Sequence, residues 1–138
     1  MKTVRLAALV AAAAVAAPVG GAAALSPTVR LAIVHTLHGC HTWSAAGKEL
    51  GPNAKIRIKR GTKLEIRMNC PMDFDFAQTA GPPLVLGDLR THAGTVRTIL
   101  FRRAGVYRLT ATNVQSSAEI GLQTLGADSS LALTIVVS

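Results

Sequence analysis

Two short groups of metal-binding side chains stand out in this chain. The first places four possible ligands within seven residues: His35, His38, Cys40 and His41. The second is rich in sulfur and comprises Met68, Cys70 and Met72. Imidazole and thioether groups both suit copper, so a copper site is chemically possible if the fold brings the two segments together.

The geometry of the first group limits how it can bind an ion. On an extended strand His38 and Cys40 share one face, and His41 takes the other. Gly39 permits a bend that would bring them to one ion. We therefore predict that a bound metal is copper, held chiefly by His38 and His41 with help from Met72. The alternative is that the histidines are ordinary strand or loop residues and the sulfur atoms belong to the core.

The two cysteines of the chain allow two roles. As a disulfide, Cys40 and Cys70 would close a loop of about 30 residues, which is worth roughly 3–4 kcal/mol on the chain-entropy account. As metal ligands they would have to remain thiolates, which is harder in an oxidising compartment outside the cell. We predict the disulfide and keep thiolate ligation as the alternative.

The N-terminal residues predict export. Lys2 and Arg5 precede an apolar run that is shorter than the roughly 18–20 residues needed to span a bilayer. An alanine triplet that ends at Ala24 supplies the small side chains accepted by signal peptidase. We predict a signal peptide over residues 1–24 and a secreted or periplasmic protein of the cell envelope. An N-terminal anchor that stays attached is the alternative.

Residues 25–138 are expected to form one domain. Alternation of apolar and polar residues predicts strands at residues 28–37, 55–59, 63–68, 95–102, 106–112 and 131–137. No sustained apolar stripe of helical period accompanies them. Short strands separated by turn residues, in a chain of this length, predict an all-β sandwich or small barrel. We expect no transmembrane segment in this mature part.

Charge and composition narrow the function classes. Without Lys2 and Arg5, thirteen Lys and Arg remain against seven Asp and Glu, a net charge of about +6. The basic residues between 55 and 67 alternate with apolar ones, which favours a solvated sheet face, and aromatic residues are too few for base stacking. We therefore expect no nucleic-acid partner, whereas an anionic envelope surface fits the charge. No nucleophile motif or complete acid–base set is present, so we expect no enzyme.

Three stretches resemble a cupredoxin domain, most closely the exported cupredoxin-like proteins of actinobacteria. They are residues 39–43 (Gly-Cys-His-Thr-Trp), 60–69 (Arg-Gly-Thr-Lys-Leu-Glu-Ile-Arg-Met-Asn) and 101–109 (Phe-Arg-Arg-Ala-Gly-Val-Tyr-Arg-Leu). The resemblance covers essentially all of residues 25–138. It implies a Greek-key β-sandwich and copper as the cofactor.

The chain departs from that family at the metal ligands. A blue-copper site needs two histidines, a cysteine thiolate and usually a weak axial methionine. In the family the first histidine follows the strand that ends in Asn, where this chain has Phe74. The cysteine and second histidine follow the Gly-x-Tyr segment, yet no Cys, His or Met comes after Tyr107. Two functions remain: a non-standard His/Met copper site, or a ligand-depleted fold acting as a non-metal binding or structural module at the envelope.

Overall fold

The structure is a computed structural model that describes residues 25–36, 41–114 and 130–138. Within these residues all regular secondary structure is β-strand. The strands are β1 (Thr28–His35), β2 (His41–Ala45), β3 (Lys48–Gly51), β4 (Asn53–Ile58), β5 (Lys63–Asn69), β6 (Asp73–Ala80), β7 (Arg90–Thr91), β8 (Val96–Leu100), β9 (Gly105–Val114) and β10 (Ser130–Val137).

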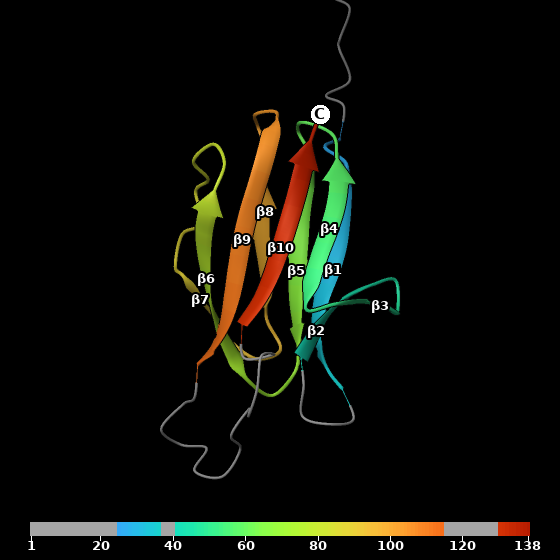
Figure 1. The fold of residues 1–138 in the computed structure, drawn as a ribbon, viewed down its shortest axis with the longest axis vertical. Helices are drawn as coiled ribbons and strands as arrows, with labels where there is room; N and C mark the ends of the chain where they lie inside the picture. The colour runs from blue at the N-terminus through green and yellow to red at the C-terminus, as the bar shows by residue number, and fades with distance from the viewer. Residues whose placement is uncertain (1–24, 37–40, 115–129) are drawn as a thin grey trace, which may run out of the picture.

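The strands form two five-stranded sheets that face each other (Figure 1). Sheet A has the order β3-β2-β1-β5-β8, and sheet B has the order β4-β10-β9-β6-β7. The pairs β1–β5 and β4–β10 are parallel, while the other pairs are antiparallel. The chain crosses between the sheets at β3–β4, β4–β5, β5–β6, β7–β8 and β8–β9, which makes the connections Greek-key rather than a simple meander. The predicted all-β sandwich is confirmed.

The core lies between the sheets and follows the period-2 pattern of the strands. In β10 the alternate residues Leu131, Leu133, Ile135 and Val137 are buried, as are Leu64, Ile66 and Met68 in β5. The largest side chains with no more than 1% exposure are Trp43, Tyr107, Phe74, Phe76 and Phe101. The buried ring of Tyr107 keeps its hydroxyl satisfied, because this group donates a hydrogen bond of 2.7 Å to the carbonyl oxygen of Arg103.

The clearest alternating segments of the sequence do not pair with each other. β4 belongs to sheet B and β5 to sheet A, so the tight turn at Arg60 and Gly61 carries the chain from one sheet to the other. The segments that became β8 and β9 are likewise divided between the sheets. An alternating sequence is compatible both with direct pairing of two strands and with their placement in facing sheets, because each strand needs only one apolar face.

The described sandwich lies entirely within residues 25–138. All strands and the buried core residues given above fall in this range, so a chain that begins at Leu25 contains the complete described fold. The predicted signal peptide, residues 1–24, lies outside the described residues and stays a prediction. In the described part of the chain there is no helix long and apolar enough to cross a membrane.

Candidate metal site

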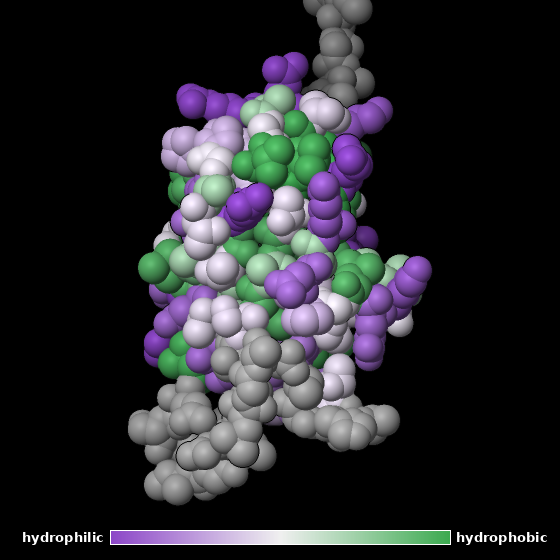
Figure 2. All heavy atoms as spheres, viewed as in Figure 1, coloured by the Kyte–Doolittle hydropathy of each residue, from purple (hydrophilic) through white to green (hydrophobic). Residues whose placement is uncertain are grey.

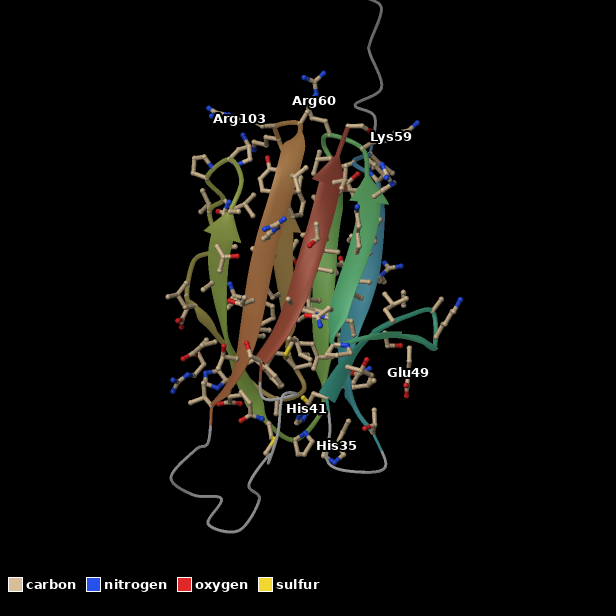
Figure 3. The ribbon with its side chains drawn as sticks, viewed as in Figure 1. His35, His41, Glu49, Lys59, Arg60 and Arg103 are labelled. Atoms are coloured by element: carbon tan, nitrogen blue, oxygen red, sulfur yellow. The ribbon has the colours of Figure 1, made fainter. Side chains whose placement is uncertain are left out.

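The strongest candidate site lies at one end of the sandwich, where β1 ends and β2 begins. His35 and His41 are register partners across this antiparallel pair. The His35 Nδ1 and His41 Nε2 atoms are 3.4 Å apart, and the rings meet edge to face at 5.1 Å between centroids. Figure 3 shows both rings at the end of the molecule opposite Arg60 and Arg103. His41 is buried and His35 is exposed.

The distance between the two ring nitrogens has a direct meaning for metal binding. Two nitrogens that each lie about 2.0–2.1 Å from one ion, at a near-tetrahedral angle, are separated by roughly 3.3–3.4 Å. The 3.4 Å between His35 and His41 matches this value. In the absence of an ion, the same spacing permits an N–H···N hydrogen bond between the rings. The separation of the two nitrogens is therefore compatible with two ligands of one ion.

The sulfur-containing link between β5 and β6 reaches the same end. Asn69, the last residue of β5, pairs with Val34, which directly precedes His35. Met72 is buried, and its Sδ atom lies 2.8 Å from the Asn113 Nδ2 atom near the end of β9. The thioether is therefore fixed in position by an amide from sheet B.

Phe74 fills the place where the family resemblance put a histidine. Its ring is fully buried in β6 and contacts the His41 ring edge to face, with centroids 5.2 Å apart. An apolar ring at this position supplies no ligand and shields one side of His41 from water. Since no Cys, His or Met follows Tyr107 either, the donor set of a blue-copper centre does not fit this chain.

The predicted ligand set is only partly represented in the structure. His41 and Met72 are described and lie at the same end of the sandwich, whereas His38 lies outside the described residues. His35 takes part in the ring pair although it was not among the predicted ligands. Within residues 25–36, 41–114 and 130–138, no group of three or more His, Cys, Asp or Glu side chains gathers around one point.

The predicted disulfide is not supported. Cys70 is a free, buried thiol whose Sγ donates to the Met72 carbonyl oxygen at 3.6 Å. Burial raises the pKa of this thiol, and the negative charge of Asp73 acts in the same direction. A Cys70 thiolate ligand is therefore disfavoured as well. Cys40 lies outside the described residues, so the pairing of the two cysteines stays a prediction.

The carboxylates near this end are already paired. Asp73 Oδ1 accepts a 2.9 Å hydrogen bond from the Ala93 amide, and Oδ2 lies 2.8 Å from His92 Nδ1. The amide first, and then His92, hold the pKa of Asp73 below its ordinary value. Asp75 forms a two-pronged pair with Arg90 at 2.9 and 3.1 Å. Neither carboxyl group has the raised pKa of a general acid, and both fasten β7 and the following turn to β6.

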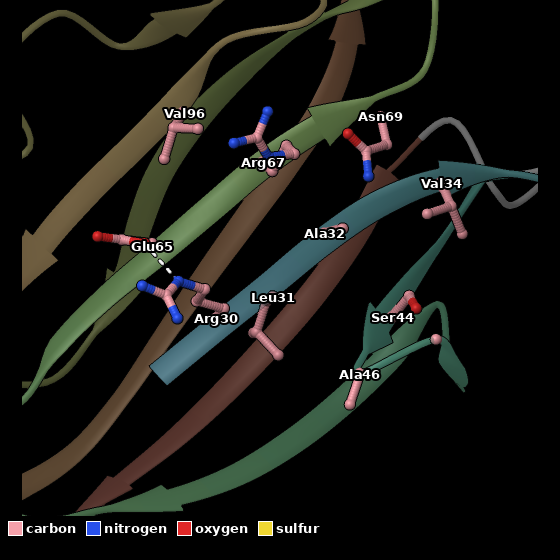
Figure 4. A pocket seen from close by; sticks show the side chains of 11 residues that line it. Arg30, Leu31, Ala32, Val34, Ser44, Ala46, Glu65, Arg67, Asn69 and Val96 are labelled. Carbon is pink, nitrogen blue, oxygen red and sulfur yellow. Dashed lines mark hydrogen bonds and ion pairs between the residues drawn. The ribbon is translucent and has the colours of Figure 1, made fainter. Parts of the chain in front are cut away.

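A separate groove lies on the outer face of sheet A (Figure 4). Its volume is about 300 Å³. Small side chains from neighbouring strands, Ala32 and Ser44, line part of it, and the ion pair between Arg30 and Glu65 lies along it. Arg67 also faces the groove. None of the histidine or sulfur residues of the candidate metal site lines it, so the groove is a distinct feature.

Comparison with known proteins finds similarity in structure alone. No family model matches the chain, and no curated protein matches it. Among solved structures, the McoA multicopper oxidase from Aquifex aeolicus has 13% identity and a TM-score of 0.45, over 80% of this chain and 26% of the oxidase. The chain therefore spans about a quarter of that protein's length.

A cupredoxin and an amicyanin are also similar in structure. A purple cupredoxin from Nitrosopumilus maritimus has 13% identity and a TM-score of 0.43, over 80% of this chain and 99% of that protein. A Cu(I) form of an amicyanin variant has 15% identity and a TM-score of 0.39, with 82% of each chain covered. Likeness at this level concerns the arrangement of strands and does not identify binding residues.

Proposed function

We propose that this chain is an exported cupredoxin-like protein that binds one copper ion through His41 and His35, with Met72 as a thioether ligand. The observation that carries this proposal is the 3.4 Å separation of the two ring nitrogens at an end of the sandwich. His38, three residues before His41, is a further ligand predicted from the sequence. Binding and handling of copper at the cell envelope is the function that follows.

The chemistry of the donor set favours copper over harder ions. Imidazole suits several transition metals, while a thioether adds a preference for Cu(I). Calcium and magnesium prefer carboxylate and carbonyl oxygens, and the carboxylates of Asp73 and Asp75 already have partners. The site is not expected to be blue, because the intense band of blue-copper proteins requires a cysteine thiolate bonded to Cu(II).

Copper titration of residues 25–138 with single-site variants tests the proposal. His35→Ala is the most informative variant, because this ring is exposed and its loss leaves the core intact. We expect His35→Ala and His41→Gln each to weaken copper binding by about tenfold or more, and Met72→Leu to weaken Cu(I) binding more than Cu(II) binding. The matched control is His92→Ala, which removes an exposed imidazole that is paired with Asp73 and should leave the affinity unchanged.

Two results would contradict the copper site. One is the absence of binding by the wild-type chain at micromolar copper. The other is equal affinity in the wild type, His35→Ala and His41→Gln, with folding of each variant checked by circular dichroism. A strong blue absorption would instead show that a cysteine thiolate is a ligand.

The alternative function is a non-metal binding module of the envelope. The groove on the outer face of sheet A favours it, because its lining combines small side chains with the exposed polar groups of Arg67 and Asn69. Failure of copper binding, together with binding defects in an Arg67→Ala variant towards a ligand found by screening, would favour this function.

A further inference from the structure

The end of the sandwich opposite His35 and His41 gathers several turns into one surface. The turn after β4 is tied to the segment between β8 and β9, because the Gly61 amide donates to the Phe101 carbonyl oxygen at 2.7 Å. The C-terminus joins them, since the Arg60 amide donates to the Ser138 carbonyl oxygen at 2.8 Å. Four exposed basic residues stand on these turns: Lys59, Arg60, Arg102 and Arg103. We call this surface the cationic end.

The loop after β6 completes the same surface. Gly81 has φ +102°, and a Cβ atom there would lie 2.5 Å from the Val106 carbonyl oxygen and 2.9 Å from the Tyr107 Cα. A Cβ atom on Gly105 would lie 3.1 Å from the ring of Pro82. At position 81 only glycine allows the two backbones to approach so closely, and at position 105 a side chain would press on the Pro82 ring. The loop that carries Pro82 and its neighbours is therefore packed directly against the turn that carries the arginines.

The four basic side chains of the cationic end form no ion pair with a described residue. The three ion pairs of the described chain all involve other cations: Arg30, Arg90 and His92. Residues 59–63, 81–87 and 101–105 contain no Asp or Glu. Figure 3 shows Lys59, Arg60 and Arg103 projecting outwards at this end. The positive charge is therefore available to an external anion.

Exposed aliphatic side chains lie beside these charges. Val85 is 93% exposed in the loop after β6, and Arg102 and Arg103 line the same surface hollow. Val106, which directly follows the arginine-bearing turn, is 50% exposed and pairs with Val136 of β10. Figure 2 shows hydrophobic surface next to hydrophilic side chains at the end of the molecule where β10 ends.

We propose that the cationic end docks on an anionic lipid bilayer, with the arginines and lysine at the headgroup phosphates and Val85 and Val106 entering the interface. Basic residues near a charged bilayer each contribute attraction, and aliphatic groups that leave water add to it. A soluble polyanion would use the charges but gain little from the exposed valines. The combination therefore favours lipid.

The path of the N-terminal segment also supports an orientation in which the cationic end faces the bilayer. The Lys63 amide donates to the Pro27 carbonyl oxygen at 2.8 Å, so the segment that leads into β1 lies at the cationic end. Residues 1–24, whose apolar run is the predicted signal, join the described domain here at Leu25. A precursor held at the membrane by that run would present the cationic end to the bilayer.

Vesicle co-sedimentation of residues 25–138 tests the proposal. The probe is a vesicle of about three parts phosphatidylcholine to one part phosphatidylglycerol, compared with pure phosphatidylcholine. We expect Arg60→Gln combined with Arg103→Gln to reduce partitioning by about tenfold or more, because each lost cation costs about fivefold. The matched control is Lys48→Gln combined with Lys55→Gln, which removes the same charge from exposed positions elsewhere and should change partitioning by less than about twofold.

A second double variant distinguishes a lipid bilayer from other anions. Val85→Ser combined with Val106→Thr keeps the charge, and we expect it to reduce vesicle binding severalfold without changing binding to inorganic polyphosphate. Equal losses of vesicle binding in the Arg60/Arg103 variant and in the Lys48/Lys55 control, or no binding to anionic vesicles, would overturn the proposed surface. Full vesicle binding by the valine variant, with equal binding to polyphosphate, would assign the surface to a soluble polyanion and overturn the lipid proposal.

Discussion

Arg97 illustrates how a buried cation is accommodated in this sandwich. Its side chain, on β8, donates hydrogen bonds to the Thr91 hydroxyl at 2.6 Å, to the Leu86 carbonyl oxygen at 2.5 Å and to the Asp88 carbonyl oxygen. The guanidinium also lies over the Phe76 ring, 4.9 Å from its centroid. Burial lowers the pKa of Arg97 from its ordinary value. The residue fastens the segment before β8 to the body of the fold.

Arg97→Lys should destabilise the protein although it keeps the charge. A lysine ammonium cannot reproduce the planar fork of donors, so carbonyl oxygens that now have a partner would lose it. We expect a loss of about 1–3 kcal/mol in the free energy of unfolding, measured by urea denaturation. Arg67→Lys, at an exposed position, is the control. Equal stability of the wild type and Arg97→Lys would show that the fork does not stabilise the fold.

The pair of Asp75 and Arg90 predicts a loss of stability in acid. The hydrogen bonds and charge of Arg90 hold the pKa of Asp75 below its ordinary value. A carboxyl group whose pKa is lower in the folded state stabilises the fold at pH values above its unfolded pKa of about 3.9. That contribution is lost as the pH falls through the lower folded value. Thermal unfolding between neutral pH and about pH 2 should show a smaller acid-dependent decrease for Asp75→Asn than for the wild type.

The state of the cysteines is a further prediction at the residue scale. If the protein is exported, the sequence predicts a disulfide between Cys40 and Cys70, although Cys70 is a free thiol in the structure. Peptide mapping without reduction should find the linked peptide, and Cys40→Ala should lower the stability of the oxidised protein by roughly 3–4 kcal/mol. Recovery of two thiols that both react with iodoacetamide would contradict the disulfide.

At the scale of elements, the hairpin of β2 and β3 shows where local geometry is strained. Ala46 has φ +48° and Gly47 has φ +78°, so both residues of this two-residue turn occupy the left-handed region. Such turns match the twist of the strands they join, but Ala is less suited than Asn to the first position. A register shift between Trp43 and Ser44 adds to the curvature of the hairpin, which borders the groove of sheet A.

Ala46→Asn should stabilise the hairpin and the protein. Asn tolerates the left-handed region better than Ala, and the gain should be about 0.5–1 kcal/mol in the free energy of unfolding. Ala46→Val is the opposite test, because a β-branched side chain is strongly disfavoured at positive φ and should destabilise the fold. The two midpoints in urea should move in opposite directions. Movement in the same direction would contradict the assigned turn.

Alternation predicted β1, β4, β5, β8, β9 and β10 from the sequence, whereas β2, β3, β6 and β7 were not predicted. β5 and β10 have one buried face and one face that is half-buried or exposed, which is the pattern that alternation detects. In β2 four successive residues from His41 to Ser44 are buried, so no alternation exists. β7 has only two residues. Without β2, the register that places His35 opposite His41 could not be derived, which is why His35 was absent from the predicted ligands.

Two opposed ends define the molecule as a whole. One end carries the histidine pair and the sulfur-containing link, and the other carries the cationic turns and the C-terminus (Figure 3). If the cationic end rests on a bilayer, the proposed copper site faces away from it. The core of packed side chains between the sheets separates the two proposed sites.

The predicted cleavage of the N-terminal segment can also be tested on the whole protein. Leu25 is 96% exposed and precedes β1, so cleavage after Ala24 would leave the described sandwich untouched. Mass spectrometry of protein from the native host should find a mature chain that begins at Leu25. Recovery of an intact chain from Met1 to Ser138 in the membrane fraction would show that the N-terminal run remains as an anchor.

Trp43 gives the protein a built-in optical reporter. It is the sole tryptophan of the chain, it is fully buried, and its Nε1 has no hydrogen-bond partner among the described residues. An indole in such an apolar setting should fluoresce at short wavelengths and shift to the red on unfolding. Because Trp43 follows His41 by two residues in β2, a Cu(II) ion at the proposed site would lie close enough to quench this emission. One emission spectrum would then report both properties. Its intensity would report occupancy of the proposed copper site, and its wavelength would report the integrity of the core.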